Sequence, residues 1–434
     1  MIKSLLSNLI SNEFILQSLF SLIFRVLAAL SGFILSALIA RAFGADQSGY
    51  FFLVFSIVNI LSVVSCLGLD QSVLFFTGAA VPDKKWGSVK LLLLKSLLIT
   101  FFITGMLSLS LYFFSDYLAV NVFRDINLRV IMKGMSAAIL GLSLTLLVAM
   151  SLQGLRRIIS SIFFLNILSN FSLVLIILNF PNIKIESFGY LYSIIQFFVF
   201  LFSIAYWWFR RPSWPNDHLQ NFDWRSVSNH SSSLFLIVVL AQIIQWSGQL
   251  ISGVWVEPAD LARLAMAQRT AMLTSFVLLA INLVVAPRFS SLFQKKDFLG
   301  INDLAISSVR LMILLTLPIV LLVLIYPRFI MGLFGEEFIL GSDILRILVL
   351  GQLVNVFTGP VNNLLIMTGN EVEMKKAMLI SGSVIIIFSF ILVPIYGVMG
   401  GAVATAMAVA SQNLISAWYV KRKLSLNIFL SWRF

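Results

Sequence analysis

Charge, cysteine and histidine are all scarce in this chain of 434 residues. Only 11% of the residues are Asp, Glu, Lys or Arg, whereas 60% are hydrophobic. The single cysteine, Cys66, excludes an internal disulfide. The two histidines, His218 and His230, provide too few ligands at too wide a spacing for a metal site. The composition therefore predicts neither a metal nor another cofactor.

Several enzyme motifs are also missing. The sequence has no Gly-x4-Gly-Lys-Ser/Thr phosphate-binding loop, no Gly-x-Ser-x-Gly elbow and no His-Glu-x-x-His pair. The longest loops expected outside the membrane, residues 115–133 and 327–343, are short for an enzyme that joins sugars there. These absences exclude a built-in ATPase site and favour a transporter over an enzyme.

Long hydrophobic runs are the main feature of the sequence. Runs of about 20 apolar residues recur along the whole chain, and each is long enough to cross a bilayer as a helix. The sequence therefore predicts an all-α polytopic membrane protein with about twelve transmembrane helices. The expected spans are residues 14–40, 49–69, 91–114, 134–152, 158–180, 188–209, 230–255, 263–286, 305–326, 344–366, 377–396 and 399–420.

Basic residues are distributed unevenly between the loops. With the N-terminus in the cytoplasm, eighteen of the 30 Lys and Arg residues fall in cytoplasmic loops and tails, and six fall in the opposite loops. Short cytoplasmic loops are enriched in Lys and Arg, so this bias predicts that both termini are cytoplasmic. The net charge of +12 is mostly a signal of topology and does not indicate a nucleic-acid partner.

The sequence also repeats itself. A shift of 214 residues superimposes spans 2 to 4 on spans 8 to 10, and Ala45-Asp46 then meets Ala259-Asp260. We therefore expect an N-terminal six-helix lobe over residues 1–210, a cytoplasmic linker over 211–229 and a C-terminal six-helix lobe over 230–434. Both halves have an even number of spans, so a pseudo-twofold axis along the membrane normal and a central cavity between the lobes are expected.

Two arginines are expected deep within apolar spans. Arg25 lies near the middle of span 1, and Arg269 lies inside span 8. A charge at the centre of a membrane helix costs roughly 2.5–3.5 kcal/mol, so such residues usually face a cavity or a partner. Both arginines are therefore predicted to line a cationic cavity that accepts an anion.

Polar residues form stripes on the neighbouring spans. In span 7, Gln242, Gln245 and Gln249 share one helical face, and Asn59 belongs to a similar face of span 2. We predict that these four side chains line the substrate cavity. The alternative is that such stripes are hydrogen-bonded seams between helices of one bundle.

Three further charges are secondary candidates. Asp70 is expected at the cytoplasmic end of span 2, where it either partners an arginine or is solvated. Arg263 and Arg310 are close enough to a membrane surface for their side chains to reach the headgroup region.

Three stretches carry a resemblance to a known family. They are LARLAMAQRT from Leu261, running on to APRFS from Ala286; ARAFGADQSG from Ala40; and GVMGGAVAT from Gly397. In combination they resemble polysaccharide transporters and O-antigen flippases, of the superfamily that also holds multidrug antiporters and the lipid II flippase. The resemblance covers essentially the whole chain. One departure is that span 7 often has an acidic residue in that family, whereas Gln245-Trp-Ser-Gly248 stands here.

The resemblance implies a function and a location. It implies a flippase that moves an undecaprenyl-diphosphate-linked oligosaccharide, such as an O-antigen repeat unit, across the bacterial inner membrane to the outer leaflet. Spans 1, 2, 7 and 8 would line the cavity, and the partners would be the lipid-linked substrate, membrane lipids and other polysaccharide-assembly proteins. A multidrug antiporter or another lipid-linked-precursor exporter shares the fold and remains an alternative, as does a polysaccharide polymerase. An antiporter for cations would be expected to have an acidic lining.

Overall fold

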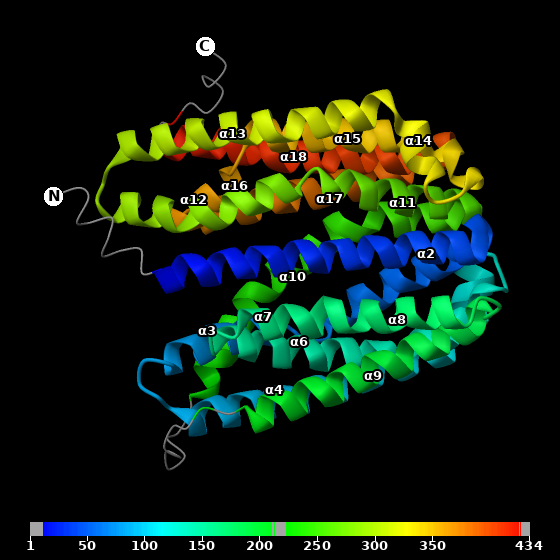
Figure 1. Ribbon diagram of the computed structural model, residues 1–434, viewed down its shortest axis with the longest axis horizontal. Helices are drawn as coiled ribbons and strands as arrows, with labels where there is room; N and C mark the ends of the chain where they lie inside the picture. The colour runs from blue at the N-terminus through cyan, green and yellow to red at the C-terminus, as the bar shows by residue number, and fades with distance from the viewer. Residues whose placement is uncertain (1–11, 211, 213–222, 425, 427–434) are drawn as a thin grey trace. The chain divides into compact units, whose positions relative to one another are not determined.

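The computed structural model describes residues 12–210, 212, 223–424 and 426. This part of the chain folds into helices and contains no strand (Figure 1). Residues 1–11, most of the predicted linker at 211–229, and residues 425 and 427–434 of the predicted C-terminal lobe lie outside the described residues.

Eleven helices in the described part are long and apolar enough to cross a membrane. The first of them, Ile23–Val64, covers most of each of the first two expected spans, and each of the other ten corresponds to one expected span. The prediction of an all-α polytopic membrane protein is confirmed.

Helix α2 (Asn12–Val64) bends at Gly44, which separates the first two expected spans. Gly44 has φ 73° and ψ 178°, a conformation that is not helical and that residues with a Cβ rarely adopt. The chain continues as helix on both sides, so a single glycine suffices to turn between the two spans.

The structure divides the chain into two compact units that interleave along the sequence. Unit 1 consists of residues up to 38, 61–115 and 130–235, and unit 2 consists of residues 39–60, 116–129 and 236 onward. Residues 39–60 of α2 thus belong to unit 2, and the first residues of α10 (Trp224–Trp255) belong to unit 1. These divisions differ from the predicted lobe boundaries at residues 210 and 230, and the pseudo-twofold relation of two six-helix lobes stays a prediction.

Unit 1 is built mainly from the helices of the first half of the chain. Besides parts of α2 and α10, its elements are α3 (Leu69–Ala80), α4 (Trp86–Tyr117), α5 (Leu128–Ser136), α6 (Ala138–Gly154), α7 (Ile158–Ile162), the π-helix η2 (Phe163–Ile167), α8 (Leu168–Asn179) and α9 (Ile185–Phe209).

The core of unit 1 combines close backbone packing with aromatic side chains. A Cβ on Gly141 of α6 would lie 2.6 Å from the carbonyl carbon of Gln196 in α9, so these two helices pack backbone to backbone. Trp207 stacks on Trp86 with ring centroids 4.9 Å apart, and its indole N–H donates to Ser151 Oγ at 3.0 Å. The buried indole nitrogen is therefore satisfied.

Unit 2 contains the helices of the second half of the chain. They are most of α10, α11 (Pro258–Leu273), α12 (Phe276–Gln294), α13 (Phe298–Ile325), α14 (Pro327–Gly332), the 3-10 helix η3 (Glu336–Gly341), α15 (Ser342–Thr358), α16 (Val361–Met367), α17 (Glu371–Tyr396) and α18 (Val398–Leu424), together with residues 39–60 of α2 and the π-helix η1 (Leu118–Val122).

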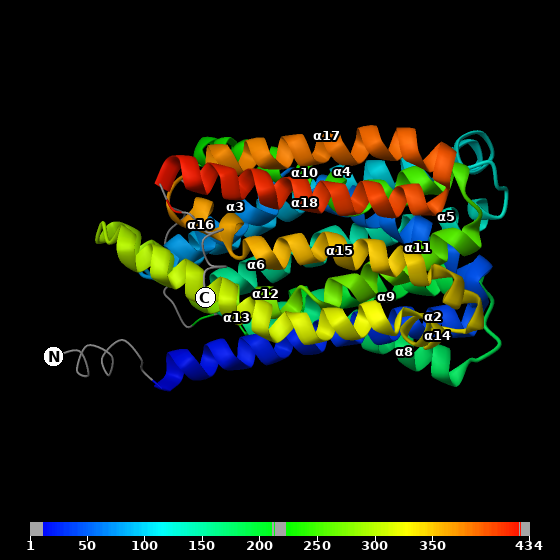
Figure 2. The same cartoon turned by 90° about the horizontal axis from the view of Figure 1, so that it is seen from above.

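Helix α18 organises the packing of unit 2, with α17 and α15 alongside it (Figure 2). Gly400 of α18 approaches α17 so closely that a Cβ would lie 2.2 Å from the carbonyl oxygen of Leu392. Gly351 of α15 meets Ala406 of α18 in the same way, at 2.8 Å from its Cα. Small residues let membrane helices approach this closely.

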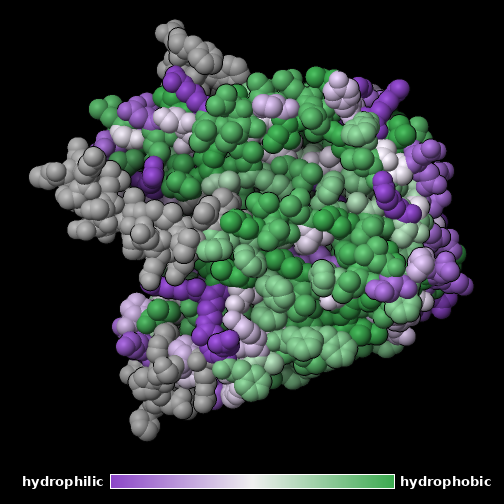
Figure 3. All heavy atoms as spheres, in the orientation of Figure 1, coloured by the Kyte–Doolittle hydropathy of each residue, from purple (hydrophilic) through white to green (hydrophobic). Residues whose placement is uncertain are grey.

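Large hydrophobic side chains cover the outward sides of the helices, as expected for a protein surrounded by lipid. Phe102 and Phe113 of α4 are 66% and 72% exposed, for example. On the face in Figure 3, hydrophobic residues cover the sides of the helices and hydrophilic residues gather toward their ends. Exposed apolar surface of this extent is incompatible with water and fits a bilayer.

Candidate functional site

Arg25 is a half-buried cation of unit 1. Its Nε atom is buried and has no hydrogen-bond partner among the described residues. No ion pair of the described residues involves Arg25 either. A buried donor without a partner costs about 1–3 kcal/mol, and more for a charged group.

Asp70 also belongs to unit 1 and is 3% exposed. Gln71 Nε2 donates to its Oδ2 at 2.8 Å, while Oδ1 is buried without a partner among the described residues. Neither expected arrangement, an arginine partner or solvation, is found. The physical reason is a turn at residues 65–68, with Leu67 and Gly68 at positive φ, which makes Asp70 begin the packed helix α3.

Arg269 of α11 is held in unit 2 by aromatic rings. Its guanidinium carbon lies 4.3 Å from the ring centroid of Phe52 and 5.6 Å from that of Phe55. Nη1 donates to the carbonyl oxygen of Ala265 at 3.1 Å, and no carboxylate pairs with Arg269 in the described part. Cation–π contacts stabilise a desolvated guanidinium by about 2 kcal/mol and leave its charge unneutralised.

The polar stripe of α10 has two roles. Gln249 is 1% exposed and donates through Nε2 to the carbonyl oxygen of Phe52 at 2.7 Å, so it joins two helices of unit 2. Gln242 accepts from the indole N–H of Trp246 one turn away, at 3.1 Å. Asn59 of α2 donates to the carbonyl oxygen of Phe55 at 2.7 Å. For Gln249 the geometry favours the seam between helices over the cavity lining.

Gln245 instead lines a cavity of about 240 Å³ inside unit 2. Helices α10, α11, α15, α17 and α18 surround it, and no Asp, Glu, Lys or Arg contributes to its wall. Its polar lining residues are Gln245, Gln268, Gln352, Gln412 and Thr405. Amide groups both donate and accept hydrogen bonds, which suits a ligand rich in hydroxyls and free of charge.

Two of these glutamines, Gln352 and Gln412, were not predicted from the sequence. Ser275 Oγ and Asn355 Nδ2 both donate to Gln352 Oε1, at 2.8 and 3.3 Å, which fixes the orientation of this amide. Gln352 lies one turn before Asn355, so the polar face of α15 was a signal that could have identified it.

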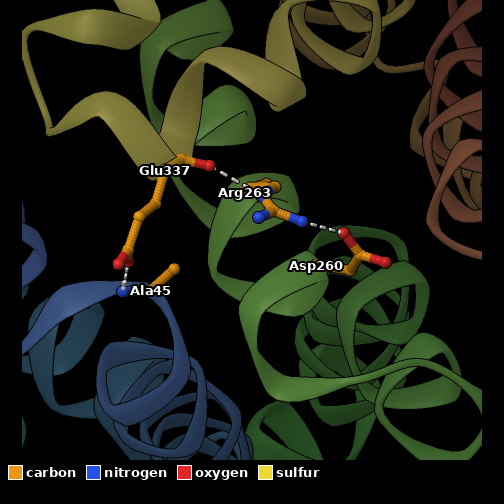
Figure 4. A network of polar contacts seen from close by, with 4 residues as sticks. All are labelled: Ala45, Asp260, Arg263 and Glu337. Carbon is orange, nitrogen blue, oxygen red and sulfur yellow. Dashed lines mark hydrogen bonds and ion pairs between the residues drawn. The ribbon is translucent and has the colours of Figure 1, made fainter.

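Arg263 takes part in a polar network at the end of unit 2 (Figure 4). Its Nη1 pairs with Asp260 at 2.5 Å, and its Nε donates to the carbonyl oxygen of Glu337 at 2.8 Å. The Glu337 carboxylate accepts from the backbone N–H of Ala45 at 2.7 Å. Arg263 therefore joins α11 to η3, whereas Arg310 of α13 is exposed and contributes to none of these contacts.

In the described ranges, no group of three or more His, Cys, Asp and Glu residues is placed to hold a metal ion. Of the predicted site residues, the structure brings Arg269, Gln242, Gln245 and Gln249 together in unit 2 with Asn59, and it places Arg25 and Asp70 in unit 1.

The long apolar helices of the described part define a polytopic membrane protein. Residues 238–395 match the family model MatE. A curated relative, the probable low-salt glycan biosynthesis flippase Agl15 of Haloferax volcanii, is 26% identical over 221 residues. That alignment covers 50% of this chain and 45% of the relative, so it spans less than half of the relative's length.

Solved structures of transporters share the fold along nearly the whole chain. An inward-facing multidrug resistance transporter of the MATE family superimposes with a TM-score of 0.75 at 12% identity, covering 93% of this chain and 98% of its own. The lipid II flippase MurJ in an inward closed conformation gives 0.74 at 18% identity, covering 95% and 90%. A MOP-superfamily transporter from Pyrococcus furiosus gives 0.65 at 13%, covering 94% of each chain.

These similarities show that the chain shares the two-lobe, all-helical fold of these solved structures. Together with the family match, they support a membrane transporter or flippase and not an enzyme.

Proposed function

We propose that this protein is a flippase that moves an undecaprenyl-diphosphate-linked oligosaccharide from the cytoplasmic to the periplasmic leaflet of a bacterial inner membrane. The observation that carries the proposal is a pair of arginines, Arg25 and Arg269, in apolar helices without carboxylate partners in the described part. Each of these guanidinium groups can bind an anionic headgroup.

The chemistry of a diphosphate-linked sugar matches both kinds of polar group. A guanidinium binds two phosphate oxygens at once, and such charge-assisted hydrogen bonds are about twice as strong as neutral ones. The uncharged glutamines of the unit 2 cavity suit sugar hydroxyls. The polyprenyl tail would stay in lipid while the headgroup crosses by alternating access.

A multidrug antiporter of the same fold is the second candidate. A site for cationic drugs needs buried acidic groups, and the unit 2 cavity has none. In unit 1, Asp70 is a buried carboxylate that a cation could bind, so the antiporter remains an alternative. The unpaired arginines support the flippase over the antiporter.

Reconstitution tests the proposed function directly. Purified protein in liposomes without ATP should transfer an undecaprenyl-diphosphate-linked oligosaccharide to the opposite leaflet, measured as its accessibility to an added glycosidase. No phosphate-binding loop is present, so ATP should not be required. Arg269→Ala should slow transfer by about 10- to 100-fold, the worth of a lost hydrogen bond to a charged group.

The exposed Arg310 provides the matched control, because Arg310→Ala also removes one positive charge. Its transfer rate should equal that of the unchanged protein. No transfer by the unchanged protein, strict dependence on ATP, or equal rates for the two alanine variants would argue against the flippase.

The orientation of the chain gives a separate prediction. Tags after Phe434 and within residues 213–222 should be cytoplasmic, and tags near Asn121 and Glu336 should be external, because basic residues concentrate in the loops assigned to the cytoplasm. Accessibility of single tags to impermeant labels measures this. Labelling of the 213–222 tag from outside would show that the assigned orientation is wrong.

A further inference from the structure

A second cavity, of about 320 Å³, lies in unit 2 at the end where α10 joins α11. We call it the Tyr50 pocket. Its polar and aromatic lining residues are Tyr50 from α2, Phe123, Arg124 and Asp125 from the segment after η1, and Trp255 and Glu257 from the α10–α11 connection. The loop charges favour the outer side of the membrane for this end of the unit.

Hydrogen bonds fix the positions of the Tyr50 and Asp125 side chains in the Tyr50 pocket. The Tyr50 hydroxyl donates to Asp125 Oδ2 at 2.6 Å, and the backbone N–H of Asn127 donates to Asp125 Oδ1 at 2.9 Å. Asn127 Nδ2 also donates to the Tyr50 hydroxyl oxygen at 3.3 Å. Tyr50 itself is 8% exposed, so the carboxylate of Asp125 is positioned by a buried partner.

The backbone beside Asp125 is unusual. The π-helix η1 ends at Val122, and Arg124 follows with φ 56°, a left-handed conformation for a residue with a Cβ. Single π-turns and left-handed residues are costly and concentrate at ligand-binding sites. The segment 118–125 thus combines two such features at the wall of one pocket.

Three groups remain available to a ligand. Trp255 is 42% exposed, and Phe390 fixes its ring edge-on with centroids 5.7 Å apart. Arg124 and Glu257 are exposed, and neither side chain makes a hydrogen bond or ion pair among the described residues. An open indole, a guanidinium and two carboxylates therefore line the same pocket.

We infer that the Tyr50 pocket is a carbohydrate-binding site, in which a neutral sugar ring stacks on Trp255 and its hydroxyls bond to Asp125, Glu257 and Arg124. This inference rests on the proposed function and adds a receiving site for the glycan, distinct from the arginines that bind the diphosphate. Two carboxylates against one guanidinium leave the lining with an excess of negative charge, which disfavours phosphate. An amphipathic indole presents the apolar face that a sugar ring needs.

The simpler role for Trp255 is as one member of an aromatic belt at the membrane surface. Trp418 of α18 allows the two roles to be separated, because it is 50% exposed, contacts Arg422 at 5.2 Å and does not line the pocket. Loss of a belt residue should have the same consequences at either tryptophan.

Saturation-transfer NMR on the full-length protein in detergent tests the inference, with methyl glycosides of glucose and N-acetylglucosamine as probes. The unchanged protein and Trp418→Ala should transfer signal to the sugar ring protons. Trp255→Ala should reduce this signal at least about fivefold, because it removes the apolar face on which the sugar ring stacks. Glu257→Gln, which alters no packing, should also reduce it, and inorganic pyrophosphate should not displace the glycosides.

Absence of signal with the unchanged protein, an unchanged signal in both Trp255→Ala and Glu257→Gln, or displacement by pyrophosphate would overturn the inference. A lowered midpoint of thermal unfolding in a tryptophan variant would identify a folding defect. In that case, the signal of Glu257→Gln decides whether the inference holds. Failure of the proposed function is distinguishable: liposomes that transfer substrate while the protein binds no glycoside refute the receiving site alone. Glycoside binding without substrate transfer refutes the flippase alone.

Discussion

Export of surface polysaccharide should stop when Arg25 is replaced by alanine in the full-length protein. The buried Nε of Arg25 has no hydrogen-bond partner among the described residues, and under the proposed function the substrate diphosphate is that partner. Removing a hydrogen bond to a charged group costs about 1.5–3 kcal/mol, which corresponds to roughly 10- to 100-fold weaker binding. The measurement is complementation of a deletion strain, with lipid-linked oligosaccharide on the cytoplasmic leaflet expected to accumulate.

Lysine at position 25 should restore export only partly. Its ammonium keeps the charge but lacks the planar fork that contacts two phosphate oxygens together. Arg310→Ala again serves as the control for loss of one positive charge, since that residue is exposed. Near-normal export by a well-expressed Arg25→Ala protein would refute a role in binding diphosphate.

Protein abundance separates this role from a structural one. If Arg25 neutralised Asp70, alanine at position 25 would leave a buried carboxylate unpaired and reduce the amount of folded protein. No such ion pair exists among the described residues, and Asp70 bonds to Gln71 instead. Arg25→Ala should therefore reach normal abundance in the membrane, and adding Asp70→Ala should restore no activity.

The course of the helices could be predicted from the sequence because membrane helices depend on local properties. A run of about 20 apolar residues can be identified as a span without knowing which other helices pack against it. Even the bend in α2 falls between the two expected spans, at the glycine that can adopt φ 73°. Its two arms were expected to belong to one lobe, however, whereas residues 39–60 belong to unit 2.

The candidate site was harder to predict. Helical periodicity shows which residues share one face of a helix, but it does not show which helix packs against that face. Gln245 and Gln249 lie one turn apart on α10, yet Gln245 lines the cavity and Gln249 bonds to the backbone of Phe52. Which amide is open depends on the helix packed opposite. The burial of Asp70 likewise depends on the turn at Leu67 and Gly68, two residues whose conformation no hydropathy pattern encodes.

Gly49→Ala should lower the thermal stability of the protein substantially. A Cβ at this position of α2 would lie 1.9 Å from the carbonyl oxygen of Pro258 and 2.5 Å from its carbonyl carbon, both within unit 2. These are backbone atoms at the first turn of α11, so no side-chain rotation relieves the overlap. Forcing one extra carbon into a well-packed interior costs about 1–3 kcal/mol, and more where the backbone must move.

Gly105→Ala is the matched control, because a Cβ at this position in α4 meets nothing within 4 Å. Alanine forms helix better than glycine by about 1 kcal/mol, so this variant should keep or slightly raise the midpoint of thermal unfolding. Gly49→Ala should lower it by several degrees, given a shift of about 2–4 °C per kcal/mol in domains of this size. Equal midpoints for the two variants would mean that α2 and α11 do not pack backbone to backbone at Pro258.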